Sequence, residues 1–388
     1  MTVLAPTHEE VLHWLALHLL PGLGKQKAVQ LISTFGSPEA VFRASPSEIE
    51  AQGVAGAVAR SLASGCSFEE AAAQQQKALE MGVAILPITD PRYPARLRDI
   101  FDPPLLLYGQ GRVELLADLP FGVVGTRRPT PYGQAVAAKF AADLAAAGLV
   151  IVSGMARGID TAAHRATLDG GGNTIAVFGC GVDHIYPAEN RKLAEEIAQK
   201  GLLLSEFPLG TAAHPQNFPV RNRIISGVSI GVLIVEGAEY SGSAITARLA
   251  MEQQREVFAV PGNVTSKMSW GPNLLIKQGA KLVQGWNDVV SELDPEYRQA
   301  LVGKGRQRLL PEMADNSASG QKDSQPVEMK PLLREILKIV PVDRVVALDE
   351  LIETLERYSS SELIAALFEL EMLGLIRQYP GKSFMKVW

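Results

Sequence analysis

Arginines stand directly beside apolar runs at two places in this sequence. Arg127 and Arg128 follow one run in "GTRRPTPYG", and Arg221 and Arg223 precede another in "NFPVRNRIISG". A guanidinium beside a buried segment is costly unless an anion or a carboxylate meets it. Arginine binds phosphate with two parallel hydrogen bonds, and small neighbouring residues let a phosphate reach backbone N–H groups. The residue types therefore indicate phosphate binding.

Four loops each present small residues, hydroxyls or guanidiniums. Their candidate phosphate-binding residues are Gly125, Thr126 and Arg127; Ser153, Gly154 and Arg157; Phe218, Arg221, Asn222 and Arg223; and Ser241, Gly242 and Ser243. Phe218 is also of the type that stacks on a base in sequence-tolerant single-strand binders. Asp160 is predicted to be a helix N-cap. The alternative for the third loop is a capped helix whose arginines pair with Glu206 or Glu236.

Other chemistries lack their sequence signatures. There is no GxGxxG after an early apolar run and no GxxxxGK[ST], so no nucleotide cofactor is indicated. The serines expected at strand ends are Ser153, Ser205, Ser241 and Ser243, and none of them stands in GxSxG with a histidine partner, so no acyl transfer is indicated. Glu206 and Glu236 each follow an apolar run singly, which is typical of a cap or ion-pair partner. His164 and His184 are interpreted as structural. No metal-ligand spacing of histidines or cysteines occurs, so the sequence predicts no metal and no cofactor.

The elements that position these loops follow from the alternation over residues 80–290. Short apolar runs, among them "FGVVG", "LVIVSG", "TIAVFG" and "IGVLIVEG", are separated by helix-length segments. This alternation predicts an extended Rossmann-like parallel sheet wrapped by helices, an α/β fold. Most runs end in glycine, serine or proline. The carboxyl edge of such a sheet is where ligands bind, so the four loops are expected to lie together there.

Changes in composition and in the pattern of apolar residues divide the chain into four predicted parts: residues 1–78, 79–292, 293–330 and 331–388. The first is a helical SAM-like or helix-hairpin-helix domain, whose turn in "PGLGKQKAVQLI" either receives a phosphate or simply needs glycine. The second is the Rossmann-like domain and the third a flexible linker. The fourth suggests a winged helix. Its third helix carries Glu362, Glu369 and Glu371 without a basic residue, which favours a protein contact over DNA reading.

Composition limits the class of protein further. The chain has 388 residues, is 47% hydrophobic and carries a net charge of −5, which excludes coating nucleic acid by bulk charge but allows a local basic groove. Its two cysteines, Cys66 and Cys180, fit a reducing cytosol. The N-terminus lacks the basic start of a signal peptide, and "VLHWLALHLL" is too short to span a bilayer. A cytoplasmic protein without a membrane segment is expected.

The motifs "GTRRPTPYG", "VSGMARGIDTAAH", "NFPVRNRIISG" and "GPNLLIKQGAKLV" occur in the order seen in the DNA-processing protein A (DprA/Smf) family, which the sequence resembles over its α/β region. The resemblance implies a single-stranded-DNA-binding protein of natural transformation that acts as a homodimer, without catalysis. It would receive incoming strands, load RecA recombinase onto them and help displace single-strand-binding protein. Carried over by motif, the candidate residues of all four loops would hold the strand.

Two departures and two alternatives accompany this resemblance. Some relatives have a lysine where this chain has "HPQNF", and many have a basic residue where it has Tyr240, so two basic contacts are expected to be missing. One alternative is a nucleotide-phosphate hydrolase similar to lysine-decarboxylase-like proteins, although the first carboxylate after "SGSAIT" is Glu252. The other is an interaction scaffold with weak DNA binding.

Overall fold

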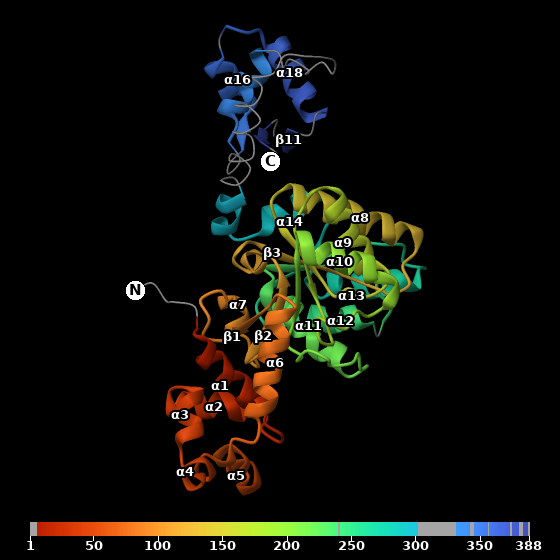
Figure 1. Cartoon of the computed structure of the whole chain (residues 1–388). Helices are drawn as coiled ribbons and strands as arrows, with labels where there is room; N and C mark the ends of the chain where they lie inside the picture. The colour runs from red at the N-terminus through yellow and green to blue at the C-terminus, as the bar shows by residue number, and fades with distance from the viewer. Residues whose placement is uncertain are drawn as a thin grey trace, which may run out of the picture. The chain divides into compact units, whose positions relative to one another are not determined.

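The computed structural model describes residues 6–239, 241–301, 331–341, 345–355, 357–372, 375–379 and 383–386. The chain divides into two compact units, Met1–Tyr297 and Arg298–Trp388 (Figure 1). The first unit contains the helical segment, the large sheet and all four candidate loops.

Three of the six helices in the helical segment of the first unit begin with a side-chain cap. The helices of this segment are α1 (His8–Leu19), α2 (Lys25–Phe35), α3 (Pro38–Arg43), α4 (Pro46–Ala51), α5 (Gly56–Ser64) and α6 (Phe68–Glu80). Thr7 and Ser45 form capping boxes with Glu10 and Glu48, and Ser37 caps α3. These side chains satisfy N–H groups that have no partner within a helix. The helical character predicted for this segment is confirmed.

A nine-stranded sheet forms the centre of the first unit. Its strands are β1 (Val83–Pro87), β2 (Leu106–Gly111), β3 (Pro120–Val124), β4 (Val150–Ser153), β5 (Thr174–Val177), β6 (Leu202–Ser205), β7 (Gly231–Ile234), β8 (Glu256–Ala259) and β9 (Lys281–Leu282), in the order β1-β2-β6-β5-β4-β3-β7-β8-β9. Strands β3 to β9 are parallel, which confirms the predicted Rossmann-like core. The sequence did not predict β1 and β2, which pair antiparallel to each other and to β6.

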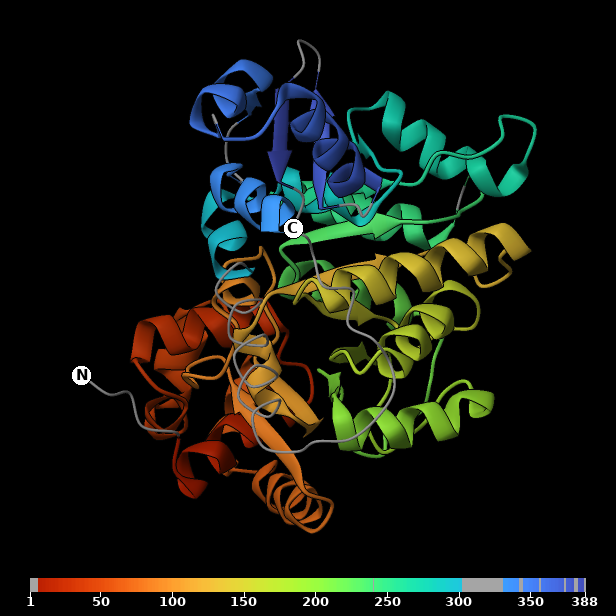
Figure 2. The ribbon, with the colours of Figure 1, turned by 90° about the horizontal axis from the view of Figure 1, so that it is seen from above.

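Helices cover both faces of the sheet. The remaining helices of this unit are α7 (Ala95–Arg98), α8 (Pro131–Ala146), α9 (Ile159–Asp169), α10 (Arg191–Lys200), α11 (Asn217–Val228), α12 (Gly242–Glu252), α13 (Trp270–Lys277) and α14 (Trp286–Glu292). Side chains of β6 alternate: Leu203 packs with α10 and the helical segment, whereas Leu202 and Leu204 pack with α11 and α12. In Figure 2 the red and orange helical segment lies at the β1–β2 end of the sheet.

Two further parts of the chain remain: the segment that follows the sheet, and the second unit. Residues 295–301 are helical, so the linker expected at 293–330 does not begin at 293; residues 302–330 lie outside the described part. The second unit contains α16 (Pro331–Ile339), β10 (Val346–Ala347), α17 (Leu348–Thr354), α18 (Ser360–Met372), β11 (Ile376–Tyr379) and β12 (Ser383–Lys386), with an antiparallel strand order β10-β12-β11. Its winged-helix assignment stays a prediction. Within the described residues, no helix has the length and apolar character needed to cross a membrane.

Candidate nucleic-acid interface

A pocket of about 600 Å³ opens at the carboxyl edge of the sheet, between the loop after β3 and the loop after β7. Along the chain, β4, β5 and β6 extend the sheet on one side of β3, whereas β7, β8 and β9 extend it on the other. The strand order therefore reverses at the β3–β7 boundary. Loops that leave neighbouring strands in opposite directions open a crevice at such a point, and ligands of α/β sheets bind there.

The first candidate loop presents arginine side chains to this pocket rather than free amides. The Thr126 N–H donates to the Glu236 carbonyl oxygen (2.8 Å), and Gly125 is packed so closely that a Cβ would lie 2.6 Å from Ile159. Arg127 and Arg128 are exposed and line the pocket. In the described part of the chain neither guanidinium forms an ion pair. The predicted phosphate contact through the Thr126 amide is thus replaced by two accessible cations.

Glu236 fixes the start of the helix that follows this loop. Its carboxylate is buried and accepts hydrogen bonds from the Thr130 N–H (2.8 Å) and the Thr130 hydroxyl (2.6 Å). Thr130 in turn accepts from the Gly133 N–H as the N-cap of α8. The interpretation of Glu236 as a helix-cap partner is confirmed.

The predicted phosphate-binding residues of the second candidate loop do not line the pocket, although Ala156 of the same loop does. Ser153 is fully buried and its hydroxyl donates to the Val123 carbonyl oxygen (2.6 Å). The Gly154 N–H donates to Asp160 (3.1 Å), as does the Ala156 N–H (3.2 Å). Arg157 pairs with Glu189 at 2.6 Å and does not line the pocket. These internal partners occupy the groups expected to hold phosphate.

Asp160 corrects a detail of the prediction. Helix α9 begins at Ile159 with Gly158 as its N-cap, so Asp160 lies inside the first turn and organises the loop before it. Burial raises the pKa of Asp160, while Arg221 and the two loop amides act in the opposite direction. Asp160 and Arg221 together line the floor of the pocket.

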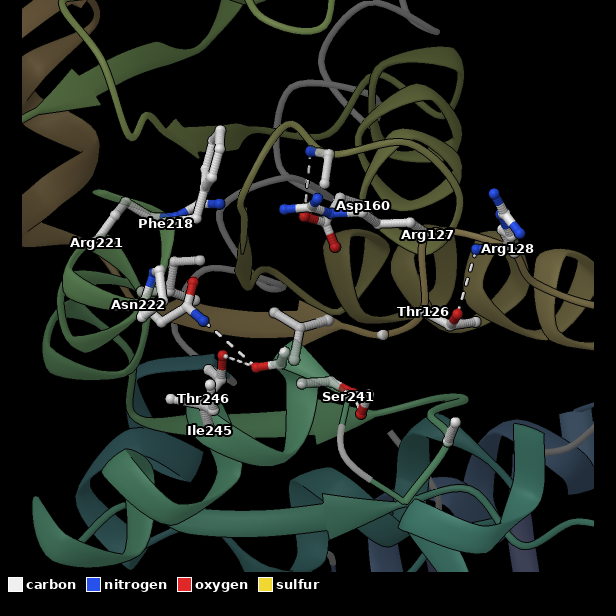
Figure 3. A pocket seen from close by; sticks show the side chains of 18 of the residues that line it. Thr126, Arg127, Arg128, Asp160, Phe218, Arg221, Asn222, Ser241, Ile245 and Thr246 are labelled. Carbon is white, nitrogen blue, oxygen red and sulfur yellow. Dashed lines mark hydrogen bonds between the residues drawn. The ribbon is translucent and has the colours of Figure 1, made fainter. Parts of the chain in front are cut away.

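Helix α11 divides the third candidate group between two sides. Phe218, Arg221 and Asn222 line the pocket (Figure 3). Arg223 does not: its Nε donates to Asp102 (2.9 Å) and a terminal nitrogen to Glu206 (2.7 Å). Two residues advance an α-helix by about 200°, so side chains at 221 and 223 must point in nearly opposite directions. The alternative of an arginine paired with Glu206 is therefore confirmed for Arg223.

Within the pocket, Arg221 is a structural cation and Phe218 an accessible ring. Arg221 is 3% exposed and donates to the carbonyl oxygens of Gly154 (2.6 Å) and Val177. Burial lowers the pKa of Arg221 to about 10. Half-buried Phe218 lies under Arg127, whose guanidinium carbon is 5.2 Å from the ring centroid. This is a cation–π distance, so the ring and a free cation are presented together.

The fourth candidate loop gives the pocket an open helix N-terminus. Helix α12 begins at Gly242 after the N-cap Ser241, whose hydroxyl bonds to that of Ser243 (2.7 Å) and not to a helix amide. A Cβ on Gly242 would meet nothing within 4 Å, so the helix start is uncovered there. N–H groups at an uncapped helix start and the helix dipole both attract anions. Tyr240, which precedes this loop, lies outside the described residues.

Tyr186 is a pocket residue that the sequence analysis missed. Its ring centroid is 5.5 Å from that of Phe218, and the residue is 44% exposed. Tyr186 follows β5 by several residues, and an isolated tyrosine in "HIYP" carries no signal that it faces a phenylalanine more than thirty residues later. The two rings form one aromatic wall of the pocket.

The histidines and possible metal ligands give no second site in the described chain. His164 is fully buried, and its Nδ1 lies 2.7 Å from the Thr174 hydroxyl; burial lowers its pKa to about 3. This fits the structural interpretation of His164. Among the described residues no group of three or more His, Cys, Asp or Glu side chains could hold a metal ion.

Comparison with known proteins assigns the family. A family model for DNA recombination-mediator protein A matches residues 84–294. This chain belongs to that family. Among the family's relatives, "DNA processing protein DprA" of Bacillus subtilis is 46% identical over 215 residues, covering 55% of this chain and 72% of the relative. "Protein Smf" of Escherichia coli is 39% identical over 298 residues, covering 76% of each chain.

Solved structures of DNA processing protein A have the same fold. The X-ray structure of the Streptococcus pneumoniae protein aligns with a TM-score of 0.66 and 34% identity, covering 75% of this chain and 99% of that one. A Helicobacter pylori structure, described in terms of its "unique single-stranded DNA binding mode", aligns with a TM-score of 0.50 and 34% identity over 55% of this chain and 97% of that one. The resemblance predicted from the motifs is confirmed.

Proposed function

We propose that this protein binds single-stranded DNA in the pocket at the β3–β7 boundary, without strong sequence preference. The observation that carries the proposal is the convergence, on one pocket, of the uncapped start of α12, the exposed Arg127 and Arg128, and the Phe218 ring. Membership of the family and the single-stranded-DNA-binding relative support it.

The pocket offers separate places for phosphate and base. A backbone phosphate at the start of α12 would accept from the N–H groups near Gly242, with Arg127 and Arg128 as its counter-charges. A neighbouring base would stack on the aromatic wall of Phe218 and Tyr186. Phosphate contacts and stacking carry little sequence information, which is the reason we expect a sequence-tolerant binder.

Residues of the second loop and Arg223 act differently in this proposal. Ser153, Gly154 and Arg221 shape the floor of the pocket through internal hydrogen bonds. Arg157 and Arg223 have carboxylate partners in place of a phosphate. We therefore infer that the strand is held mainly by Arg127, Arg128, Phe218 and the start of α12.

The role in natural transformation is inferred from the family. We infer that the protein acts in the cytoplasm as a homodimer, receives incoming single strands, loads RecA recombinase and helps displace single-strand-binding protein. The support is the resemblance of the motifs around the pocket. A RecA strand-exchange assay on strands coated with single-strand-binding protein tests it, because a loader shortens the lag before exchange. An unchanged lag would contradict the loading role.

We infer binding without catalysis. Among the described residues that line the pocket, Asp160 is the one with a carboxylate. This carboxylate accepts hydrogen bonds from two backbone N–H groups of the preceding loop. Glu252 lies at the opposite end of α12, where it pairs with Arg248 at 3.6 Å. Incubation with nucleoside monophosphates tests the hydrolase alternative, and release of free base would favour it.

Fluorescence anisotropy with single- and double-stranded oligonucleotides over a salt series tests the binding proposal. Arg127→Ala should weaken single-strand affinity about tenfold at low salt, equivalent to about 1.4 kcal/mol. It should also flatten the log–log salt dependence by about 0.7, the value for one phosphate contact on a single strand. Arg248→Ala is the matched control, because Arg248 is an exposed arginine on α12 outside the pocket. Full affinity in Arg127→Ala would remove the central claim.

A further inference from the structure

A set of buried charges lies behind the pocket, on the side of α11 opposite Phe218 and Arg221. Arg223 donates to Asp102 (2.9 Å) and to Glu206 (2.7 Å), and the same Glu206 oxygen accepts from the amine of Lys25. Lys25 is the first residue of α2 and Glu206 directly follows β6. These four residues, called here the Glu206 cluster, therefore join the helical segment, the sheet and α11.

The Glu206 cluster is electrically balanced and its two central side chains are buried, whereas Lys25 and Asp102 are 37% and 42% exposed. It contains two cations and two carboxylates, and the side chains of Glu206 and Arg223 are 2% and 5% exposed. Two titratable neighbours, His18 and Tyr93, are neutral near pH 7. Burial, aided by Lys25, lowers the pKa of His18 to about 4, and burial raises the pKa of Tyr93. Loss of one cation would leave an uncompensated negative charge at a buried site, which is strongly unfavourable.

The helical segment also holds the loop that carries Tyr186. The Lys77 amine in α6 pairs with Asp183 (2.6 Å), and Asp183 accepts from the Gly210 N–H (2.8 Å). The Gln74 amide bonds both backbone groups of Leu209, at 2.9 and 3.1 Å. The helical segment thus contacts the loop that carries Tyr186 through Lys77, and it reaches α11, which carries Phe218, through Glu206.

We propose that the helical segment of residues 8–80 controls the grip on the DNA strand by holding α11 in place through the Lys25–Glu206–Arg223 contacts. This inference rests on the proposed function of the pocket. Lys25 and Glu206 are positioning residues: they touch no part of the pocket and act through Arg223, which shares a rigid helix with Phe218 and Arg221. A partner that pulls the helical segment away from the sheet would loosen α11 and release the strand.

The glycine turn before α2 takes on a different role in this proposal. In place of a phosphate, the turn meets the carboxylate of Glu206, because Lys25 at the start of α2 reaches that carboxylate. A carboxylate near a helix start is favoured for the same electrostatic reason as a phosphate. The turn therefore docks the helical segment onto the sheet.

Lys25→Gln in the full chain tests this inference, with Lys27→Gln as its matched control. Lys27 lies on the same helix, but its amine bonds Gln30 and Gln52 within the helical segment. Hydrogen exchange without DNA should show faster exchange of the α11 amides in Lys25→Gln than in Lys27→Gln. The Kd for single-stranded DNA should rise about tenfold in Lys25→Gln, which is the loss expected when the stacking of one base is partly lost. The slope of log Kd against log salt concentration should not change. Lys25→Arg should restore both measurements.

The outcomes separate this inference from the proposed function. Wild-type exchange of α11 in Lys25→Gln would overturn the control by the helical segment, whatever the DNA affinity. A salt slope lowered by about 0.7 would show that Lys25 meets phosphate directly, which would also overturn it. The wild type could instead fail to bind single-stranded DNA while the α11 amides still exchange faster in Lys25→Gln. That result would contradict the proposed function and leave the positioning contact in place.

Discussion

Substitution of Arg221 by methionine distinguishes a structural arginine from one that reads phosphate. Arg221 is 3% exposed and donates to the carbonyl oxygens of Gly154, which directly follows β4, and of Val177, the last residue of β5. Methionine keeps most of the side-chain volume and removes the charge with both hydrogen bonds. We expect the free energy of unfolding to fall, whereas Arg127→Ala should leave it within about 0.5 kcal/mol because Arg127 is exposed.

The magnitude follows from two opposing contributions. Two hydrogen bonds from a charged donor contribute about 3–6 kcal/mol together. The pKa of Arg221 is lowered from 12.5 to about 10, which corresponds to about 3 kcal/mol of unfavourable burial that methionine relieves. The net expected loss of stability is therefore roughly 0–3 kcal/mol.

Urea unfolding followed by circular dichroism, on wild type, Arg221→Met and Arg127→Ala, measures this difference. Gly154→Ala provides an independent perturbation, since its Cβ would lie 2.2 Å from a terminal nitrogen of Arg221. It should destabilise wild type but cost less in the Arg221→Met background, because the two residues are in contact. Wild-type stability in Arg221→Met together with lost DNA binding would refute the reasoning and make Arg221 a direct strand contact.

Two further predictions concern other parts of the chain. The pKa of His164 is lowered from 6.5 to about 3 by burial, so the unfolded chain takes up a proton first as pH falls, and stability should decrease below pH 6.5, by about 3 kcal/mol at pH 4.5. Urea midpoints from pH 7.5 to 4.5 should show this for wild type and less for His164→Asn; equal pH dependence would contradict it. Deleting residues 331–388 should leave single-strand affinity within about twofold by anisotropy, because the α18 sequence is acidic; a large loss would show that this unit reads DNA.

Periodicity predicted the parallel core but not the antiparallel end of the sheet. The runs that became β3 to β8 alternate with helix-length segments, and this alternation is the signature of a parallel crossover. Strands β1 and β2 enclose a single four-residue helix, α7. Antiparallel pairing needs no long connection, so nothing in their spacing marks them as members of the same sheet.

Residue types indicated the edge of the sheet at which the candidate pocket lies, and three-dimensional packing decided which side chains face that pocket. Arg221 and Arg223 look alike in "FPVRNR", but only the phase of α11 sends one to the pocket and the other to Glu206. Ser153 ends a buried strand, and its hydroxyl is taken by the neighbouring strand. The local sequence shows that a polar side chain lies near the carboxyl edge of the sheet. It does not show the hydrogen-bond or ion-pair partner of that side chain, because the partner comes from a segment far along the chain.

The contact between Lys25 and Glu206 spans 181 residues, which has a consequence for the order of folding. During synthesis α1 to α6 can form early, since their contacts are local and close quickly. β2, however, pairs with β6, which follows some ninety residues later, and Glu206 comes directly after β6. The helical segment therefore folds before the residues that it docks against have been synthesised. The Lys25–Glu206–Arg223 contacts can form only after β6 and α11 have been synthesised, so the pocket proposed to bind DNA would be completed late.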